Sequence, residues 1–246
     1  MITVETTCLT ERRKLVREHS TAGKRYRYVQ LQGVPIEITD TIISNALSDT
    51  ELSCIATQED YPLGFGADPD RAIARAVRCG AKYLSCALIP RDVDSPDKLR
   101  EFADKLRIIA AKVKAVGLTF AFHPIGPDMR DMEGKPVYER LMELLPDDVQ
   151  LTFCIHAALS NGVDPLPILK KYAGRIGLVH FKDDAPQPDG TRHLMPLGSG
   201  VTDWAPILKG CSDAGVKYIF VEQERWLKDA FDCARDSYDY LVHLGM

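Results

Sequence analysis

The sequence predicts an α/β fold, a closed (β/α)8 TIM barrel that forms a single domain over residues 1–246. Short apolar runs alternate with stretches that have helical periodicity or helix caps, and strict alternation implies a parallel sheet with helical crossovers. A chain of 246 residues also has the usual size of such a barrel. The main alternative is an open doubly wound sheet, but the first turn has no G-x-G-x-x-G fingerprint, which weakens a dinucleotide-binding interpretation.

The strands are predicted where β-branched and aromatic residues cluster between turn residues. Most of these runs are apolar throughout, as expected of strands that are buried on both faces. In chain order they cover residues 2–8, 27–32, 52–57, 83–89, 118–123, 150–156, 176–181 and 218–222.

Helices are predicted between the strands from capping residues and from apolar residues at three- and four-residue steps. Asp68-Pro69 and Asp164-Pro165 each supply an N-cap followed by a proline at the first helical position. The predicted helices cover residues 10–19, 39–47, 68–80, 99–113, 138–144, 164–174, 203–214 and 227–244.

Composition excludes several classes of partner. The net charge of −4 offers no basic field, so nucleic acid is not an expected partner. No apolar run approaches the ~20 residues of a membrane-spanning helix and no signal peptide opens the chain, so no membrane contact is expected. The seven Cys are odd in number and lack CxxC spacing, which favours a reducing compartment. We expect a cytoplasmic protein and, because dimers are the commonest oligomers, consider a homodimer.

Four consecutive predicted strands end in a residue type that binds metals: His123, His156, His180 and Glu222. The carboxyl ends of parallel strands meet at one rim of a barrel, where active sites lie, so these side chains are expected to converge. Imidazole and carboxylate together suit Mn, Zn or Co better than Ca or Mg, which predicts a divalent metal site. The alternative for each His alone is a rim residue that bonds to the backbone.

Lys182 and Asp183 follow the strand that contains His180. Strand alternation places Lys182 on the same face as His180, where it would bind a substrate oxygen, and Asp183 would then orient a neighbour. Glu224 shares the face of Glu222 in the same way and is a further candidate for substrate binding. The alternative for Lys182 and Asp183 is a surface ion pair.

Further candidates lie in loops near the same rim. Asp128, after the fifth predicted strand, is expected to reach back as a catalytic carboxylate. The turn Gly198-Ser-Gly200 precedes a helix start, a layout that can bind phosphate through backbone N–H groups, although such turns usually exist for their backbone angles alone. His193 and Trp204, on either side of that turn, are candidates for substrate contact, and the alternative for Trp204 is core packing.

Segments along most of the chain, and especially after residue 162, carry a family resemblance. They read GAKYL at 80–84, GRIGLVHFKD at 174–183, LGSGVTDW at 197–204 and VEQE at 221–224. In combination these segments resemble the xylose isomerase-like TIM-barrel superfamily of sugar phosphate isomerases and epimerases. The resemblance implies a barrel fold and a small sugar or polyol as substrate.

The same resemblance implies a divalent metal held by acidic residues on the fifth, sixth and eighth strands and by a His on the seventh. His180 and Glu222 match two of these positions. At the other two, this chain offers His123 or Asp128 and His156 in place of the acids. A site with fewer carboxylates binds metal more weakly or prefers softer ions.

A metal-dependent isomerase or epimerase that removes the proton next to a carbonyl is therefore the leading hypothesis. Glu222 would serve as ligand and base, and Lys182 would bind a substrate oxygen. His123 or Asp128 would be the second proton-transfer group. A keto-inositol dehydratase is an alternative, because it begins with the same proton abstraction. A degenerate, non-catalytic relative that binds a sugar is another, motivated by the missing carboxylates.

Overall fold

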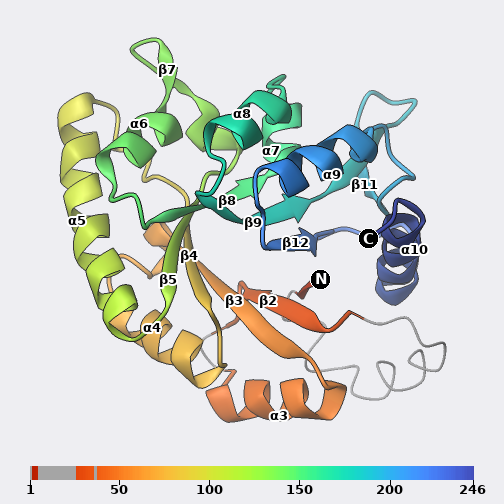
Figure 1. The fold of residues 1–246 in the computed structure, drawn as a ribbon, viewed down its shortest axis with the longest axis horizontal. Coiled ribbons are helices and arrows are strands. Elements are labelled where there is room, and N and C mark those ends of the chain that lie inside the picture. Colours follow the sequence, from red (N-terminus) through yellow and green to blue (C-terminus); the bar gives the residue numbers. More distant parts are fainter. Residues whose placement is uncertain (1, 5–25, 36–37) are drawn as a thin grey trace.

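The computed structural model describes residues 2–4, 26–35 and 38–246, and Figure 1 shows strands at its centre with helices around them. The strands form a closed barrel in the order β1-β12-β9-β8-β5-β4-β3-β2, with parallel neighbours. The predicted (β/α)8 barrel is confirmed, and the open doubly wound sheet is wrong. The strand bounds are β1 (Ile2–Val4), β2 (Tyr28–Gln32), β3 (Ser53–Asp60), β4 (Tyr83–Ala87), β5 (Thr119–His123), β8 (Gln150–Cys154), β9 (Ile176–Phe181) and β12 (Tyr218–Val221).

The helices cover the outside of the barrel (Figure 1). Asp68 and Asp164 cap α4 and α8 as predicted, because each carboxylate accepts a backbone N–H of the first turn. The helix predicted over 10–19 and the part of the first strand predicted over 5–8 lie outside the described residues. The helix bounds are α3 (Asp40–Thr50), α4 (Pro69–Arg78), α5 (Pro96–Ala115), α6 (Val137–Leu144), α7 (Ile155–Ser160), α8 (Pro165–Lys171), α9 (Trp204–Asp213) and α10 (Ala230–His243). None of the helices in this described part combines the length and apolarity that a bilayer crossing requires.

The sixth barrel strand is shorter than predicted. β8 ends at Cys154 and α7 begins at Ile155, so His156 lies in the first turn of a helix and not at a strand end. The Sγ atom of Cys154 accepts a hydrogen bond from the backbone N–H of Ala157 at 3.4 Å, which satisfies one of the free donors at the helix start. The prediction that four consecutive strands end in a metal-binding residue type is therefore wrong at His156.

Other differences also lie at the carboxyl-end rim. β3 continues past its predicted end at residue 57 and carries Gln58, Glu59 and Asp60 to the rim. The stretch after Lys182, for which no strand was predicted, contains an antiparallel hairpin. The remaining elements are the short helices η1 (Tyr61–Leu63) and η2 (Gly126–Met129), the hairpin of β6 (Asp131–Met132) and β7 (Lys135–Pro136), and the hairpin of β10 (Asp183–Pro186) and β11 (Arg192–Met195).

The barrel strands carry an apolar layer followed by a polar one. Ile55, Leu178 and Phe220 belong to a separate buried apolar cluster. His180 lies two residues after Leu178 on β9, hence on the same face, and is fully buried. Its Nε2 lies 3.1 Å from Oε1 of Gln30, so the interior ends in hydrogen-bonding groups towards the carboxyl ends of the strands.

Candidate active site

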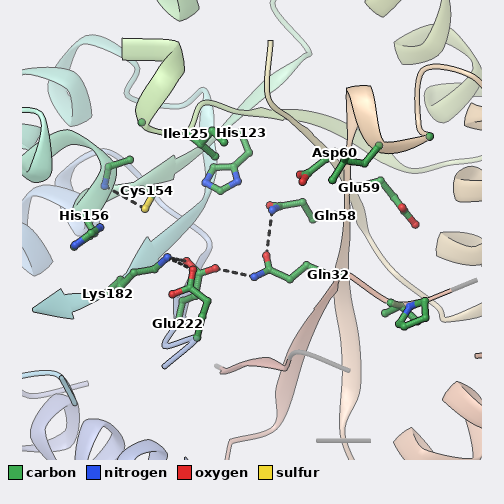
Figure 2. A pocket seen from close by; sticks show the side chains of 18 of the residues that line it. Gln32, Gln58, Glu59, Asp60, His123, Ile125, Cys154, His156, Lys182 and Glu222 are labelled. Atoms are coloured by element: carbon green, nitrogen blue, oxygen red, sulfur yellow. Dashed lines mark hydrogen bonds and ion pairs between the residues drawn. The ribbon is translucent and has the colours of Figure 1, made fainter. Parts of the chain in front are cut away.

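A cavity of about 1030 Å³ opens at the carboxyl ends of the barrel strands. In Figure 2 Gln32 and Gln58 lie on one side of it and Lys182 and Glu222 on another, with His123 between them. These side chains come from strand ends that are far apart in the sequence. Enzymes with this fold bind their substrates at this end of the barrel, so the cavity is the candidate active site.

Glu222 follows β12 directly and is the centre of a buried polar cluster. Its Oε1 accepts a hydrogen bond from Nε2 of Gln32 at 2.7 Å. Its Oε2 lies 3.1 Å from Nζ of Lys182 and 3.3 Å from Nδ1 of His180. Lys182 also reaches Oε1 of Glu224 at 2.5 Å. One ammonium group thus joins two carboxylates, and the structure brings Lys182 and His180 together with Glu222 and Glu224, although both glutamates lie after the end of β12.

Glu222 and Lys182 hold each other in the charged state. Burial alone would raise the pKa of Glu222, but its interactions with His180, Lys182 and Gln32 outweigh burial and keep that pKa well below its ordinary value. For Lys182 burial would lower the pKa, but the carboxylates of Glu222 and Glu224 outweigh it, and the pKa is raised. Both groups are therefore charged at neutral pH.

His123, the last residue of β5, is a second imidazole in this cluster. The centroid of its ring lies 4.6 Å from that of His180, with 66° between the ring planes. Both of its ring nitrogens are buried and have no hydrogen-bond partner among the described residues. Burial and the neighbouring His180 hold the pKa of His123 well below its ordinary value. A neutral imidazole with an unused lone pair can bind a metal or accept a proton.

The cavity offers donors for a metal but no complete ligand set. In the part of the chain that the structure describes, no group of three or more His, Cys, Asp or Glu side chains is arranged to hold an ion. The unpartnered nitrogens of His123 and Nδ1 of His180, beside the carboxylate of Glu222, nevertheless fit the donor chemistry of Zn, Mn or Co. These three side chains are the metal-binding candidates.

His156 has a different partner. It lines the same cavity, but its Nε2 lies 3.3 Å from Oδ2 of Asp184. In Figure 2 its ring lies beyond Cys154 as seen from His123. The structure therefore does not bring His156 together with the other predicted ligands.

Asp128 is fully buried and does not line the cavity. Its Oδ1 accepts the backbone N–H of Ile89 and its Oδ2 that of Ile125, each at 3.0 Å. Burial, opposed by these two hydrogen bonds, raises the pKa of Asp128 to about 6. Because both oxygens tie the loop after β4 to the loop after β5, the expectation that this carboxylate reaches back into the site is not met.

Asp183 takes up the donors of the glycine turn that was considered for phosphate. Its Oδ2 accepts the backbone N–H groups of Gly198 and Gly200 at 3.0 and 3.2 Å, and its Oδ1 accepts that of Thr202 at 3.3 Å. A Cβ atom on Gly200 would lie 2.2 Å from Oδ1 of Asp183, so this close approach requires glycine. The N–H groups of the turn thus bind an internal carboxylate and are not free for phosphate.

Trp204 belongs to the core. It is fully buried, its Nε1–H donates to Asp183 at 2.9 Å, and its ring stacks on Phe181 with centroids 4.5 Å apart. The substrate contact predicted for Trp204 is therefore wrong, and the packing alternative holds. His193 lies in a neighbouring cavity of about 460 Å³, which shares Lys182 and Glu224 with the larger one.

Four polar residues at the strand ends were not singled out from the sequence. Gln30 and Gln32 on β2 and Gln58 on β3 are buried, and Gln32 is the register partner of Gln58. Asp60 lines the cavity and has no hydrogen-bond or ion-pair partner among the described residues; burial raises its pKa. The sequence did offer one signal for them. Gln30 and Gln32 lie two positions apart in an otherwise largely apolar strand, so both side chains are on the same face.

Known proteins share this architecture. A family model described as xylose isomerase-like TIM barrel matches residues 59–240. An inosose dehydratase from Lacticaseibacillus casei is 27% identical over 146 residues, and the match covers 52% of this chain and 48%, about half, of the relative. A sugar phosphate isomerase/epimerase from Parabacteroides distasonis superposes with a TM-score of 0.79 at 16% identity, over 98% of this chain and 92% of that one. The IOLI protein with a bound zinc atom gives 0.67 at 16% identity, over 89% and 88%.

Proposed function

The chain belongs to the xylose isomerase-like TIM-barrel family, and from this premise we propose that it is an isomerase or epimerase of a sugar, sugar phosphate or related polyol. The observation that supports this most is the charged pair of Lys182 and Glu222 in the cavity at the strand ends. In this class of reaction a proton leaves the carbon next to a carbonyl, and negative charge develops on the carbonyl oxygen. A largely buried ammonium group is suited to stabilise that oxygen, because charges interact strongly where water is excluded.

A divalent metal would be held by Nδ1 of His180, a carboxylate oxygen of Glu222 and an imidazole nitrogen of His123. The bound ion would supply Lewis acidity to the oxygens of the substrate. Zinc, cobalt or manganese suits this donor set better than magnesium, and the IOLI protein of similar fold holds zinc. The contact with Asp184 leaves His156 out of this assignment.

Proton transfer is assigned to groups that can change charge easily. The lowered pKa of Glu222 makes it a weak base, so its role is to stabilise the positive charge of Lys182 and of a bound metal. Asp60, whose pKa is raised by burial and which faces the cavity without a partner among the described residues, is suited to take up and return a proton. His123 has two unused ring nitrogens, but its lowered pKa makes it a weak base as well, so its role is that of a metal-binding candidate. Lys182, steadied by Glu224, binds the substrate oxygen.

Hydrogen exchange with solvent tests this proposal. The protein is incubated in D2O with a panel of ketoses, aldoses and inososes, with and without Zn, Mn or Co. Deuterium at the carbon next to the carbonyl is then followed by proton NMR. Lys182→Met and Glu222→Gln should each slow the exchange at least about 100-fold, because both remove charge stabilisation.

Lys209→Met is the matched control, since Lys209 is 75% exposed on α9 and pairs with Asp213. It should exchange at the wild-type rate. The proposal fails if no substrate of the panel exchanges, or if Lys182→Met exchanges as fast as Lys209→Met.

Elimination of water is the second candidate, and the match to an inosose dehydratase favours it. It starts with the same proton abstraction but also needs an acid that protonates the leaving hydroxyl. Asp60, with its raised pKa, would be that acid. A product that is lighter by one water and absorbs in the ultraviolet identifies a dehydratase, and a product of unchanged mass identifies an isomerase or epimerase.

A sugar-binding protein without turnover is the third candidate. Its motivation is that the strand ends offer His123 and Cys154 where the family resemblance implies acids. Binding of a sugar in calorimetry, combined with no deuterium exchange in any metal, would identify this case.

A further inference from the structure

The neighbouring cavity of about 460 Å³ continues the larger cavity past Lys182. Lys182, His156 and Glu224 line both cavities. Beyond them, the walls of the neighbouring cavity come from β11 and from the loop after β12. Figure 2 shows Lys182 and His156 on the opposite side of the larger cavity from Asp60. A substrate whose carbonyl lies at Lys182 therefore has room to extend into the neighbouring cavity as well.

Two guanidinium groups in the neighbouring cavity have unused hydrogen-bond donors. Arg192 donates to Asp184 from Nε at 2.5 Å and from Nη2 at 2.6 Å, so its Nη1 group has no partner among the described residues. This paired contact also fixes the direction of the guanidinium plane. The guanidinium group of Arg225 has neither a hydrogen bond nor an ion pair within the described part of the chain.

The loop that carries Arg225 is held against β11. Nε2 of Gln223 donates to the backbone oxygen of Leu194 at 3.3 Å and to that of Arg225 at 3.0 Å. His193, the residue before Leu194, has a buried Nδ1 for which the described residues offer no hydrogen-bond partner. Trp226, which is 40% exposed, completes the wall. Contacts within the protein thus place these donors before a ligand binds.

The two cavities differ in charge. Five carboxylates and two cations line the larger cavity, namely Glu59, Asp60, Asp68, Glu222 and Glu224 with Arg71 and Lys182. The neighbouring cavity combines Arg192 and Arg225 with Lys182, and Glu224, its one carboxylate among the described residues, is already bound to Lys182. An anionic group is therefore attracted to the neighbouring cavity and repelled by the larger one. The free groups of the neighbouring cavity are donors, which suits a ligand whose oxygens only accept hydrogen bonds.

We propose that the neighbouring cavity is a subsite for an anionic group, a phosphate ester or a carboxylate, at the end of the substrate away from the reacting carbonyl. Arg225 and Nη1 of Arg192 bind its oxygens, His193 donates from Nδ1, and the indole of Trp226 packs on the adjoining carbon atoms. That the ligand is the substrate rests on the proposed function. The binding of the anion does not, because it follows from the donors of this cavity.

Fluorine NMR tests anion binding without substrate, metal or turnover. The full chain carries 5-fluorotryptophan at its two Trp residues, and Trp226→Phe assigns the signals. A chelating resin removes metal, and sodium phosphate or sodium acetate is titrated at an ionic strength held constant with sodium chloride. Trp226 lines the cavity, whereas Trp204 is fully buried. We expect a saturable shift of the Trp226 signal alone, with a dissociation constant on the order of 1 mM.

Arg225→Met should weaken this binding at least about 10-fold, because it removes charge-assisted hydrogen bonds. Arg100→Met is the matched control, since Arg100 is 59% exposed and pairs with Asp97 on α5, which Figure 1 places across the barrel from β11 and α10. It should bind as the wild type does. A shift with phosphate alone identifies a phosphate ester as the ligand, a shift with acetate alone identifies a carboxylate, and a shift with both supports either source.

The proposal is overturned if neither anion shifts the Trp226 signal saturably up to about 50 mM. Equal affinities of Arg225→Met and Arg100→Met also overturn it.

The deuterium-exchange assay supplies a second readout. Arg225→Met should raise KM about 10-fold for anionic substrates at an unchanged kcat, and should leave uncharged substrates unaffected. A KM that rises equally for both kinds of substrate contradicts the subsite. If no substrate exchanges, the proposed function fails and the fluorine result stands. If exchange occurs without anion binding, the subsite alone fails.

Discussion

Two buried carboxylates near the strand ends of this barrel are bound in different ways. Asp183 accepts three backbone N–H groups, from Gly198, Gly200 and Thr202, and one side-chain N–H, from Trp204. Glu222 is bound by side chains, those of Gln32 and Lys182. Backbone donors are fixed by the path of the chain, whereas side chains can turn over or leave. The difference indicates that Asp183 holds a loop in place and that Glu222 can exchange its partners with a ligand.

The largest expected effect on stability is that of Asp183→Asn. The amide keeps the shape of the carboxylate, but its NH2 group faces backbone N–H groups that cannot reverse direction. We expect the free energy of unfolding to fall by about 4 kcal/mol. Urea denaturation measures it, with Asp147→Asn as the control, because Asp147 is fully exposed and should change it by less than about 0.5 kcal/mol. A cost below about 1 kcal/mol for Asp183→Asn would contradict the structural role of this carboxylate.

Gly200→Ala attacks the same contact from the other side. The added Cβ would lie 2.2 Å from Oδ1 of Asp183 and 2.5 Å from the backbone oxygen of Asp184, which cannot move aside. We expect a loss of about 3 kcal/mol in the free energy of unfolding, from the overpacking and the displaced hydrogen bonds. Gly126→Ala is the control, since a Cβ there meets its nearest neighbour at 3.6 Å. Equal midpoints in urea for the two variants would exclude the clash.

Asp128 extends the comparison to a carboxylate with fewer donors. Its pKa is raised to about 6 in the folded chain, because two backbone N–H groups do not compensate its burial. Between about pH 4 and about pH 6 the folded state therefore holds a proton that the unfolded state has released, and stability falls as the pH rises. Relative to Asp128→Asn, the wild type should lose at most about 3 kcal/mol across this window. Urea denaturation at several pH values measures this difference, and a wild type that gains stability relative to the variant would contradict the raised pKa.

Glu222→Gln should have the smallest effect on stability, although it removes a buried charge. Gln32 can turn its amide over, and Lys182 keeps an amide oxygen beside it together with its ion pair to Glu224, so the variant can satisfy these groups again. We expect a loss of about 1 kcal/mol in the free energy of unfolding, against about 4 kcal/mol for Asp183→Asn. Thermal and urea unfolding of the two variants side by side measure the contrast. Equal losses would show that backbone and side-chain donors are equivalent here.

Much of the fold followed from local patterns in the sequence. Apolar runs and caps predicted the barrel, and strand alternation brought Lys182 to the side of His180. The segment around His156 did not follow, because a short apolar run has the same appearance in a strand and in a buried helix. There the structure ends the strand at Cys154 and starts a helix.

The buried glutamines Gln30, Gln32 and Gln58 could not be identified individually. An amide inside a strand has no chemistry of its own, and its meaning here depends on which residues lie beside it after the barrel closes. Gln32 contacts Glu222, which is 190 positions away in the sequence. Only the order of the strands around the barrel makes these two residues neighbours.

The closure of the barrel depends on β1, which links β2 to β12. Among the described residues β1 and β12 share one register pair, Ile2 with Val221, whereas β3 and β4 share five. The bond from Gln32 to Glu222 crosses this seam from the end of β2 to the residue after β12. It therefore adds a contact across the joint of the barrel that has the fewest register pairs among the described residues. A ligand that strengthens the contact between Gln32 and Glu222 would therefore also stabilise the closed barrel against opening between β1 and β12.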